Sequence, residues 1–244
     1  MFESFCPPVG YRFEFHEKFG STNDRARELG AGWIVAARRQ TAGRGRMGRP
    51  YDCAAGGLWF SMTVKPDCPF QETFSLPAAA AVCARNAIGG KAKIKWPNDI
   101  LVDGKKVCGI LCEAVNGVIV AGFGINVANP LPDSLPDAGR AEKSPEELLS
   151  AITRELAAMV AGYPENRPAI IQTYCEHCLT LMKYVDVVYR NMPLYGFACA
   201  IDKNGGLMVM TQESHTVVTV YSGEATIVDK QEGETPAVPP PNRI

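Results

Sequence analysis

The first 125 residues alternate short apolar runs with turn residues, a pattern that predicts a sheet with few helices. Strands are expected at 33–37, 58–64, 93–95, 100–102, 106–114 and 118–123. Asp103-Gly104 and Asn116-Gly117 separate neighbouring runs and are typical of tight hairpin turns, because these residue types tolerate positive φ. The last four runs therefore predict a meander of antiparallel strands.

Four segments have the apolar spacing or the capping residues of helices. Ser21 can cap a helix that ends near Gly30, and an Ala-rich run over 74–88 predicts a buried helix. Ser144 begins a capping box with proline at the first helical position, followed by apolar residues at helical spacing. A further helix is expected over 168–180.

The pattern changes after Lys183, where short strands separated by turns predict a small all-β unit. These strands are expected at 185–190, 194–201, 206–210 and 217–221. The tail from residue 230 is rich in proline and is expected to be disordered. The predicted fold class is α+β, with a larger unit at 1–180, a smaller unit at 181–229 and a tail at 230–244.

Composition narrows the function classes. Charged residues make up 21% of the chain and nearly cancel to a net charge of −1, which gives no bulk argument for binding nucleic acid or an anionic membrane. No apolar stretch is long enough to span a bilayer, and the N-terminus lacks the pattern of a signal peptide. Nine cysteines, mostly within apolar runs, indicate reduced thiols and a cytoplasmic protein. The thiols expected to be buried are Cys53, Cys83, Cys108, Cys112 and Cys199.

One cysteine pair has a spacing that metal sites use. Cys175 and Cys178 form a C-x-x-C pair with His177 between them. A single pair without a second one is weak evidence for zinc, so two cysteines on a helix face are the favoured interpretation. The role of this cluster stays open.

Residues 38–57 form a long loop without apolar periodicity, and its first part concentrates positive charge. Residues 38–49 hold five arginines and three glycines but no acid. Glycines let backbone N–H groups approach an anion, and arginines offer permanently charged forks to phosphate or carboxylate. The spacing is neither that of a P-loop nor that of a dinucleotide fingerprint. An anionic ligand is the favoured interpretation, while nucleic-acid contact and a solvated loop stay open.

A second candidate is the segment Lys95-Trp96-Pro97-Asn98-Asp99. Pro97 fixes its own φ and restricts Trp96, so the corner presents an amide beside a carboxylate. A carboxylate near a phosphate-binding loop commonly holds Mg²⁺, which prefers oxygen ligands. From spacing alone, a plain turn whose polar side chains bond their own backbone is the favoured interpretation.

Two strands complete the candidate chemistry. Lys106 enters an apolar strand, where burial of its charge is costly unless it meets an anion. Strand alternation is expected to place Lys106 and Cys108 on one face and Gly109 on the other. Taken alone, the lysine is better interpreted as part of a solvated edge. In the next strand, Gly122 and Gly124 permit close approach of a flat ligand.

Four segments, in this order, resemble the catalytic core of bacterial biotin–protein ligases. They are Ser21-Thr22-Asn23; Gln40 with Gly43-Arg44-Gly45-Arg46-x-Gly48-Arg49; Lys95-Trp96-Pro97-Asn98-Asp99 with Lys106-x-x-Gly109-Ile110; and Gly122-x-Gly124-Ile125-Asn126. The similarity runs from about residue 13 to 128, and Ser222-Gly223-Glu224 resembles the closing Gly-Gly-Glu of the family. Each match alone is weak, but all four in order are highly specific.

The resemblance implies a class-II-synthetase-like mixed sheet with helices, plus a small C-terminal SH3-like barrel. It implies an enzyme that forms biotinyl-5′-AMP from biotin and ATP with Mg²⁺, then transfers biotin to a lysine of a biotin carboxyl carrier protein domain. We therefore expect Arg46 and Lys106 to face one pocket, where they neutralise a carboxylate that meets a phosphate. Asp99 is a candidate to orient the acceptor lysine and to hold Mg²⁺ beside the ATP phosphates.

The implied roles fall on three sets of residues. The catalytic residues are Lys106, Arg46 and Asp99. The biotin-binding residues are Ser21, Thr22, Asn23, Gln40, Gly45, Arg46 and Lys106. The residues at the ATP or adenylate are Arg44, Arg49, Tyr51, Trp96, Asn98, Asp99, Gly109, Gly122, Gly124 and Asn126.

The chain also departs from the common pattern of the family. Tyr51 stands where the family often has a tryptophan that packs on adenine, so an aromatic face is retained. Ser21 comes too early to leave room for the N-terminal helix-turn-helix of bifunctional members, which implies a monofunctional ligase without operator binding. A lipoate–protein ligase shares the core architecture, although the intact Gly-Arg-Gly-Arg loop argues against it. A nucleic-acid-binding module is the alternative from another class, and both a monomer and a homodimer stay open.

Overall fold

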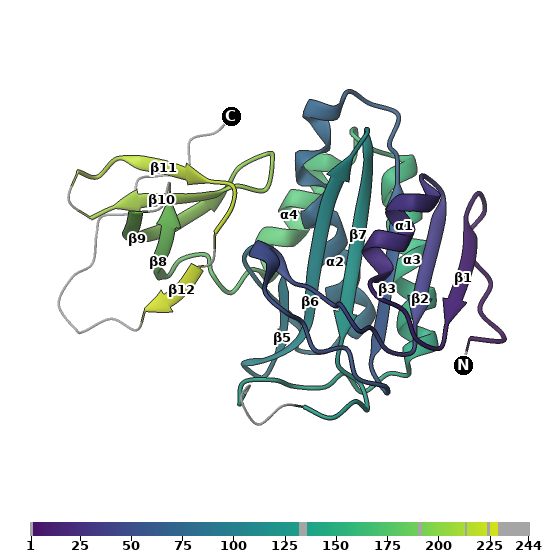
Figure 1. The fold of residues 1–244 in the computed structure, drawn as a ribbon. Coiled ribbons are helices and arrows are strands. Elements are labelled where there is room, and N and C mark those ends of the chain that lie inside the picture. The colour runs from purple at the N-terminus through teal and green to yellow at the C-terminus, as the bar shows by residue number, and fades with distance from the viewer. Residues whose placement is uncertain (1, 132–135, 190–191, 213, 224, 229–244) are drawn as a thin grey trace.

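The computed structural model describes residues 2–131, 136–189, 192–212, 214–223 and 225–228. Within these ranges the chain forms two sheets and four α-helices (Figure 1). The α+β class predicted from the sequence is therefore confirmed. The tail predicted at 230–244 lies outside the described residues.

The larger sheet has seven strands in the order β1-β2-β3-β7-β6-β5-β4. They are β1 (Arg12–His16), β2 (Trp33–Ala37), β3 (Leu58–Val64), β4 (Lys93–Lys95), β5 (Asp99–Val102), β6 (Lys105–Val115) and β7 (Val118–Ile125). β1 and β2 are parallel and the other neighbours are antiparallel, so the sheet is mixed. The predicted meander is confirmed, and both hairpin turns have the expected positive φ at Asp103 and Asn116.

Helices cover both faces of this sheet. One face packs against α1 (Thr22–Leu29), and the other packs against α2 (Leu76–Ile88) and α3 (Pro145–Ala161), with α4 (Arg167–His177) beside α2 (Figure 1). Because both faces are covered, every residue of β3 is buried. Ser21 caps α1 and Ser144 forms the predicted capping box at α3. None of the helices in the described ranges is long and apolar enough to cross a membrane.

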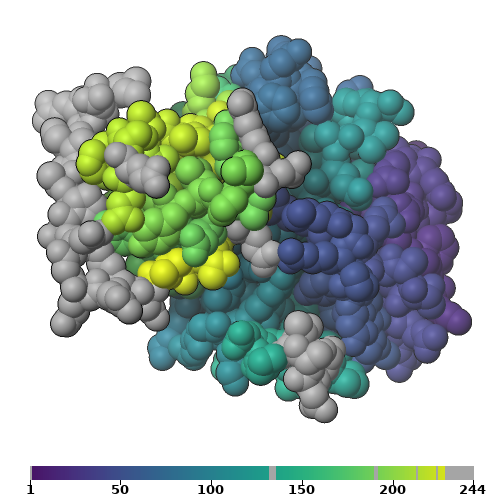
Figure 2. All heavy atoms as spheres, turned by 60° about the vertical axis from the view of Figure 1, so that its left-hand side comes forward, coloured from purple at the N-terminus to yellow at the C-terminus, as the bar shows by residue number. Residues whose placement is uncertain are grey.

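The smaller sheet has five antiparallel strands in the order β11-β10-β9-β8-β12. They are β8 (Tyr184–Tyr189), β9 (Met192–Ile201), β10 (Leu207–Thr211), β11 (Val217–Val220) and β12 (Ala225–Val228). The expected barrel is not closed among these residues, since no described pairing joins β11 to β12. Figure 2 shows this unit, in green and yellow, in contact with the larger one. The Trp96 indole donates to the Gly205 carbonyl across the contact, at 3.0 Å.

Several local predictions need correction. The sequence did not reveal β1 or β12, which lie at the edges of their sheets. The phenylalanines of β1 find their apolar partners in Phe2 and Phe5, which precede it. The helix expected from residue 74 begins at Leu76, after a 3₁₀ turn over Phe70–Ser75. All nine cysteines are free, but Cys112 and Cys199 are partly exposed and not buried as expected.

Candidate active site

A cavity of about 620 Å³ opens beside the glycine-rich loop, between that loop and the strands β5, β6 and β7. All of the site residues predicted from the sequence line it. They are Ser21, Thr22, Asn23, Gln40, Arg44, Gly45, Arg46, Arg49, Tyr51, Trp96, Asn98, Asp99, Lys106, Gly109, Gly122, Gly124 and Asn126. The structure thus brings four distant segments together, although the role of each residue remains a prediction.

One end of the cavity is built from buried neutral groups at the start of α1. The Thr22 backbone N–H donates to the Gln40 side-chain oxygen at 2.6 Å. The Ser61 hydroxyl lies 2.7 Å from the Thr22 hydroxyl and 2.6 Å from Asn23 Oδ1. The Gln40 amide nitrogen in turn donates to the sulfur of Cys53 at 3.0 Å. This end is therefore fixed by hydrogen bonds before any ligand binds.

Sequence reasoning missed Ser61, which has no motif around it. Its signal is a hydroxyl in the middle of β3, a strand that is otherwise almost entirely apolar. A buried hydroxyl needs a partner, and here the partners are two of the predicted site residues. A polar side chain at the centre of a buried strand could thus have indicated a site residue from the sequence.

Glycines of β7 form the floor of the cavity. A Cβ added to Gly122 would lie 2.1 Å from Asn23 Oδ1, and one added to Gly124 would lie 2.7 Å from a ring carbon of Tyr51. The Tyr51 hydroxyl donates to the Gly124 carbonyl at 3.1 Å. Both positions require glycine because other side chains already occupy the space above the backbone. The structure sets Gly122 at the neutral end, beside Asn23, although we predicted it on the nucleotide side.

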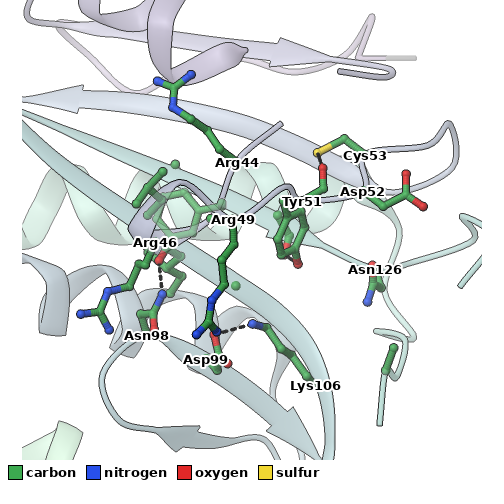
Figure 3. A pocket seen from close by; sticks show the side chains of 18 of the residues that line it. Arg44, Arg46, Arg49, Tyr51, Asp52, Cys53, Asn98, Asp99, Lys106 and Asn126 are labelled. Atoms are coloured by element: carbon green, nitrogen blue, oxygen red, sulfur yellow. Dashed lines mark hydrogen bonds and ion pairs between the residues drawn. The ribbon is translucent and has the colours of Figure 1, made fainter. Parts of the chain in front are cut away.

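Charged groups gather at the opposite end (Figure 3). Lys106 Nζ lies 2.8 Å from Asp99 Oδ1 and 5.9 Å from the centre of the Tyr51 ring. The backbone N–H of Lys106 donates to the Asp137 carbonyl at 2.6 Å, and the backbone N–H of Gly139 donates to the Lys106 carbonyl at 2.8 Å. The lysine backbone is therefore paired on this side, which excludes the solvated sheet edge favoured from the sequence alone.

The predicted alternation along β6 is wrong. Leu101 pairs with Lys106 whereas its neighbour Ile100 pairs with Cys108, so β6 contains a bulge at the residue between them. A bulge inserts one residue and shifts the faces of the strand. Consequently Cys108 is buried in the core, and a Cβ on Gly109 would lie 3.3 Å from the side chain of Lys106. Lys106 shares its face with Gly109, not with Cys108.

The arginines of the loop have different surroundings. Arg46 Nη1 donates to the Gly223 carbonyl of the smaller unit at 2.8 Å. Arg44 binds Asp24 through both terminal nitrogens, at 2.6 and 2.5 Å, and this hydrogen bonding lowers the pKa of the Asp24 carboxyl. Figure 3 shows the Arg44 side chain directed away from Lys106 and Asp99. The Arg44 guanidinium is thus bound to α1, and its expected contact with the nucleotide stays a prediction.

Polar side chains around the charged end are held by the protein itself. Asn98 Nδ2 donates to the Ile110 carbonyl at 2.5 Å. Asn126 Oδ1 accepts from the amide of Asn129 at 3.1 Å, and Asn129 is a buried cavity residue that the sequence did not single out. Trp96 is 2% exposed, and its indole bonds the smaller unit. Asn98 and Trp96 therefore shape the wall of the cavity.

Burial keeps the titratable neighbours neutral. It raises the pKa of the Tyr51 hydroxyl well above its ordinary value, and it raises the pKa of the Cys53 thiol to about 12. A phenol and a thiol with such pKa values carry no charge near neutral pH. The charge of the cavity is therefore set by its arginines, Lys95, Lys106 and the carboxylates.

The cysteine pair near the end of α4 lies apart from this cavity. The Cys178 N–H donates to the Cys175 carbonyl at 3.2 Å, and both thiols are partly buried with raised pKa values. Among the described residues, no group of three or more histidine, cysteine or acidic side chains is arranged to hold a metal ion. Both cysteine side chains pack against the main hydrophobic core.

The cavity of this α+β fold has neutral hydrogen-bonding groups at one end and cations at the other. Such a cavity is suited to a ligand with two parts, one polar and one anionic. Residues 9–128 match the model of the biotin/lipoate A/B protein ligase family. The chain is also 34% identical to the bifunctional ligase/repressor BirA of Bacillus subtilis, across 88% of this chain and 74% of that protein. The chain belongs to the biotin/lipoate A/B protein ligase family.

One further relative and one solved structure are also similar to this chain. The biotin–[acetyl-CoA-carboxylase] ligase of Mycobacterium tuberculosis is 31% identical, over 72% of each chain. Among solved structures, the biotin protein ligase of Aquifex aeolicus in complex with biotin and ATP superimposes with a TM-score of 0.74. That alignment covers 90% of this chain and 99% of that chain at 24% identity, so it establishes the fold.

Proposed function

We propose that the protein is an ATP-dependent biotin–protein ligase. It forms biotinyl-5′-AMP and transfers biotin to a specific lysine of a biotin carboxyl carrier protein domain. The observation that supports this most directly is the convergence of Arg46, Lys106 and Asp99 on one cavity whose other end holds Ser21, Thr22 and Asn23. The Mycobacterium tuberculosis relative is a biotin ligase by name, which favours biotin over lipoate as the acid.

In the first half-reaction a carboxylate oxygen of biotin attacks the α-phosphorus of ATP, and pyrophosphate leaves. Two anions must meet, so the step needs positive charge in place beforehand. Lys106 is suited to this, because a ligand carboxylate or phosphate oxygen can replace its present partner Asp99. Arg46, which lines the same cavity, can then cover the acyl-phosphate and exclude water.

In the second half-reaction the neutral amine of the acceptor lysine attacks the acyl carbon, and AMP leaves. Once Lys106 binds the ligand, the carboxylate of Asp99 is released to accept a proton or to hold a cation. Asp99 is the residue that would hold Mg²⁺, which prefers oxygen ligands and would neutralise phosphate charge. The nine free thiols are compatible with a protein that works in the cytoplasm, where thiols stay reduced. A carrier domain and ATP as substrates are compatible with the same location.

Mass spectrometry of the protein incubated with ATP, Mg²⁺ and biotin tests the proposal, and we expect bound biotinyl-AMP. A thermal-shift titration with biotin against lipoate separates the two acids, since the true ligand stabilises the fold by mass action. Stabilisation by lipoate alone would favour the lipoate ligase. Tight, salt-sensitive binding of DNA in a filter assay without biotin would favour the nucleic-acid-binding module.

A further inference from the structure

Glu113, on β6, does not line the cavity, yet it contacts Asn23 at the neutral end and two arginines close to it. Its Oε2 atom accepts from Asn23 Nδ2 at 2.7 Å. The same oxygen lies 3.0 Å from Arg27 of α1 and 3.8 Å from Arg44 of the glycine-rich loop. One carboxylate thus touches the two segments that enclose this end of the cavity.

The contact with Asn23 decides which way its side-chain amide faces. A carboxylate only accepts hydrogen bonds, so Glu113 must face the amide nitrogen and not the oxygen. The nitrogen also points to the Leu111 carbonyl at 3.4 Å, while Oδ1 accepts from the Ser61 hydroxyl. With Gly122 beneath it, Asn23 has one favoured orientation.

Through its contact with Arg44, Glu113 also helps to fix the position of the glycine-rich loop. Arg44 is bound by Asp24 through two hydrogen bonds, and Asp24 also pairs with Arg27 at 3.0 Å. Asp24, Arg27, Glu113 and Arg44 therefore alternate in charge around one cluster. This cluster joins β6, α1 and the beginning of the glycine-rich loop.

These ion pairs add little to the stability of the fold. The four side chains are 28–39% exposed, and pairs at such positions are screened by solvent. Their effect is on geometry, because they hold α1 and the loop in fixed positions relative to the sheet. A residue of this kind affects ligand binding more than folding.

We propose that Glu113 is a positioning residue for the biotin end of the cavity, where it fixes the amide of Asn23 and the beginning of the glycine-rich loop. This inference rests on the proposed function, since biotin is the ligand that reports it. Lys106, Asp99 and Tyr51, at the charged end, lie outside the cluster. The affinity for biotin should therefore depend on Glu113, and the affinity for ATP should not.

Biotin-dependent exchange between ATP and pyrophosphate provides the test. Glu113→Ala should raise the KM for biotin about tenfold, as expected for loss of a hydrogen bond to a charged group, and leave the KM for ATP unchanged. Glu113→Gln should recover most of the loss, because its amide oxygen can accept from Asn23. Glu28→Ala is the matched control, since Glu28 pairs with Arg25 of the same helix and does not contact the cluster.

A KM for biotin that stays within about twofold in Glu113→Ala would overturn the inference, and so would equal impairment in Glu113→Gln. A loss of kcat with both KM values unchanged would mean a smaller folded fraction and would also overturn it.

If Glu113→Ala does not fold, a second comparison tests the inference. The single variant Asn23→Asp is compared with the double variant Asn23→Asp and Glu113→Gln, in which the hydrogen bond between the two side chains has donor and acceptor exchanged. The double variant should bind biotin better than the single one, and no improvement would contradict the role. Absence of exchange in the parent protein would count against the proposed function instead.

Discussion

The two ends of the cavity are held in different ways. At one end Thr22, Asn23 and Ser61 are neutral, buried and hydrogen-bonded to one another. At the other end Lys106 and Asp99 are charged, and their side chains are 39% and 22% exposed. The first end cannot rearrange without leaving buried polar groups unsatisfied, whereas the second can exchange an internal ion pair for a ligand anion.

This difference indicates that the two ends of the cavity have different functions. A preorganised neutral end supplies affinity for the polar head of the acid, because little ordering is needed on binding. The charged end supplies chemistry, because its cations are available where two anions must meet. Substitutions at the neutral end should therefore act on the KM for biotin, and substitutions at the charged end should act on adenylate formation, retention or ATP binding.

The largest effect is expected from Lys106→Ala. Removing this cation should slow biotin-dependent ATP–pyrophosphate exchange about a thousandfold, in the range seen when a charge-stabilising donor is lost. Lys105→Ala is the matched control, since its side chain is exposed and precedes Lys106 in the same hairpin. Exchange at the parental rate in Lys106→Ala would contradict the assigned role.

Arg46→Gly should separate adenylate formation from adenylate retention. We expect exchange within about tenfold of the parent rate, because Lys106 remains in place, but release of biotinyl-AMP into solution. Filtration of a reaction mixture followed by mass spectrometry of the filtrate measures the release. Arg49→Gly, in the same segment, is the comparison. Retention of the adenylate by Arg46→Gly would show that another residue covers it.

A pair of glycine substitutions tests whether the neutral end is rigid. Gly122→Ala sets a methyl group 2.1 Å from Asn23 Oδ1, and we expect the KM for biotin to rise by about ten- to a hundredfold. Gly109→Ala meets Tyr51 and Lys106 at 3.1 and 3.3 Å, and these side chains can move aside, so the effect should be smaller. Gly20→Ala is a control with open space. Equal effects at 122 and 109 would argue against the difference in rigidity.

Tyr51 tests the nucleotide side of the comparison. Tyr51→Ala should raise the KM for ATP about tenfold through loss of a stacking surface, with the KM for biotin unchanged. Tyr51→Trp should keep the affinity for ATP, because the aromatic face remains. Tyr51→Phe removes only the hydrogen bond to the Gly124 carbonyl and should have little effect. A selective change in the KM for biotin would assign Tyr51 to the other end.

Sequence patterns predicted the main strands and the members of the cavity well, because apolar runs and glycine–arginine motifs are local. β2, β3 and β4 have the predicted bounds, and all predicted site residues line one cavity. The orientation of side chains was less predictable. The bulge in β6 reverses the expected faces of Cys108 and Gly109, because it depends on how β5 pairs with β6 and not on β6 alone.

Residues that act through partners were also missed. Ser61, Glu113 and Asn129 have no motif. Ser61 and Glu113 are recognised only by contacts with residues distant in sequence, and Asn129 by its contacts with Asn126 and Arg140. Arg44 shows the converse. It belongs to a conspicuous motif, but its charge is matched by Asp24, which no spacing rule connects to it. Motifs thus locate a site more readily than they assign individual roles.

The smallest effect is expected from thiol modification, and it tests the buried neutral end directly. Burial raises the pKa of Cys53 to about 12, so at pH 8 only about one molecule in 10⁴ carries the reactive thiolate. Iodoacetamide should therefore label exposed Cys6 but spare Cys53 and leave exchange activity intact, as peptide mass spectrometry can show. The same treatment in urea should label both cysteines.

Because the folded-state pKa of Cys53 is raised, its contribution to stability is complete below about pH 9 and falls as the pH rises towards 12. Labelling of Cys53 at pH 8 with loss of biotin binding would mean that this end opens readily, and the contrast between a rigid end and an exchangeable end would not hold.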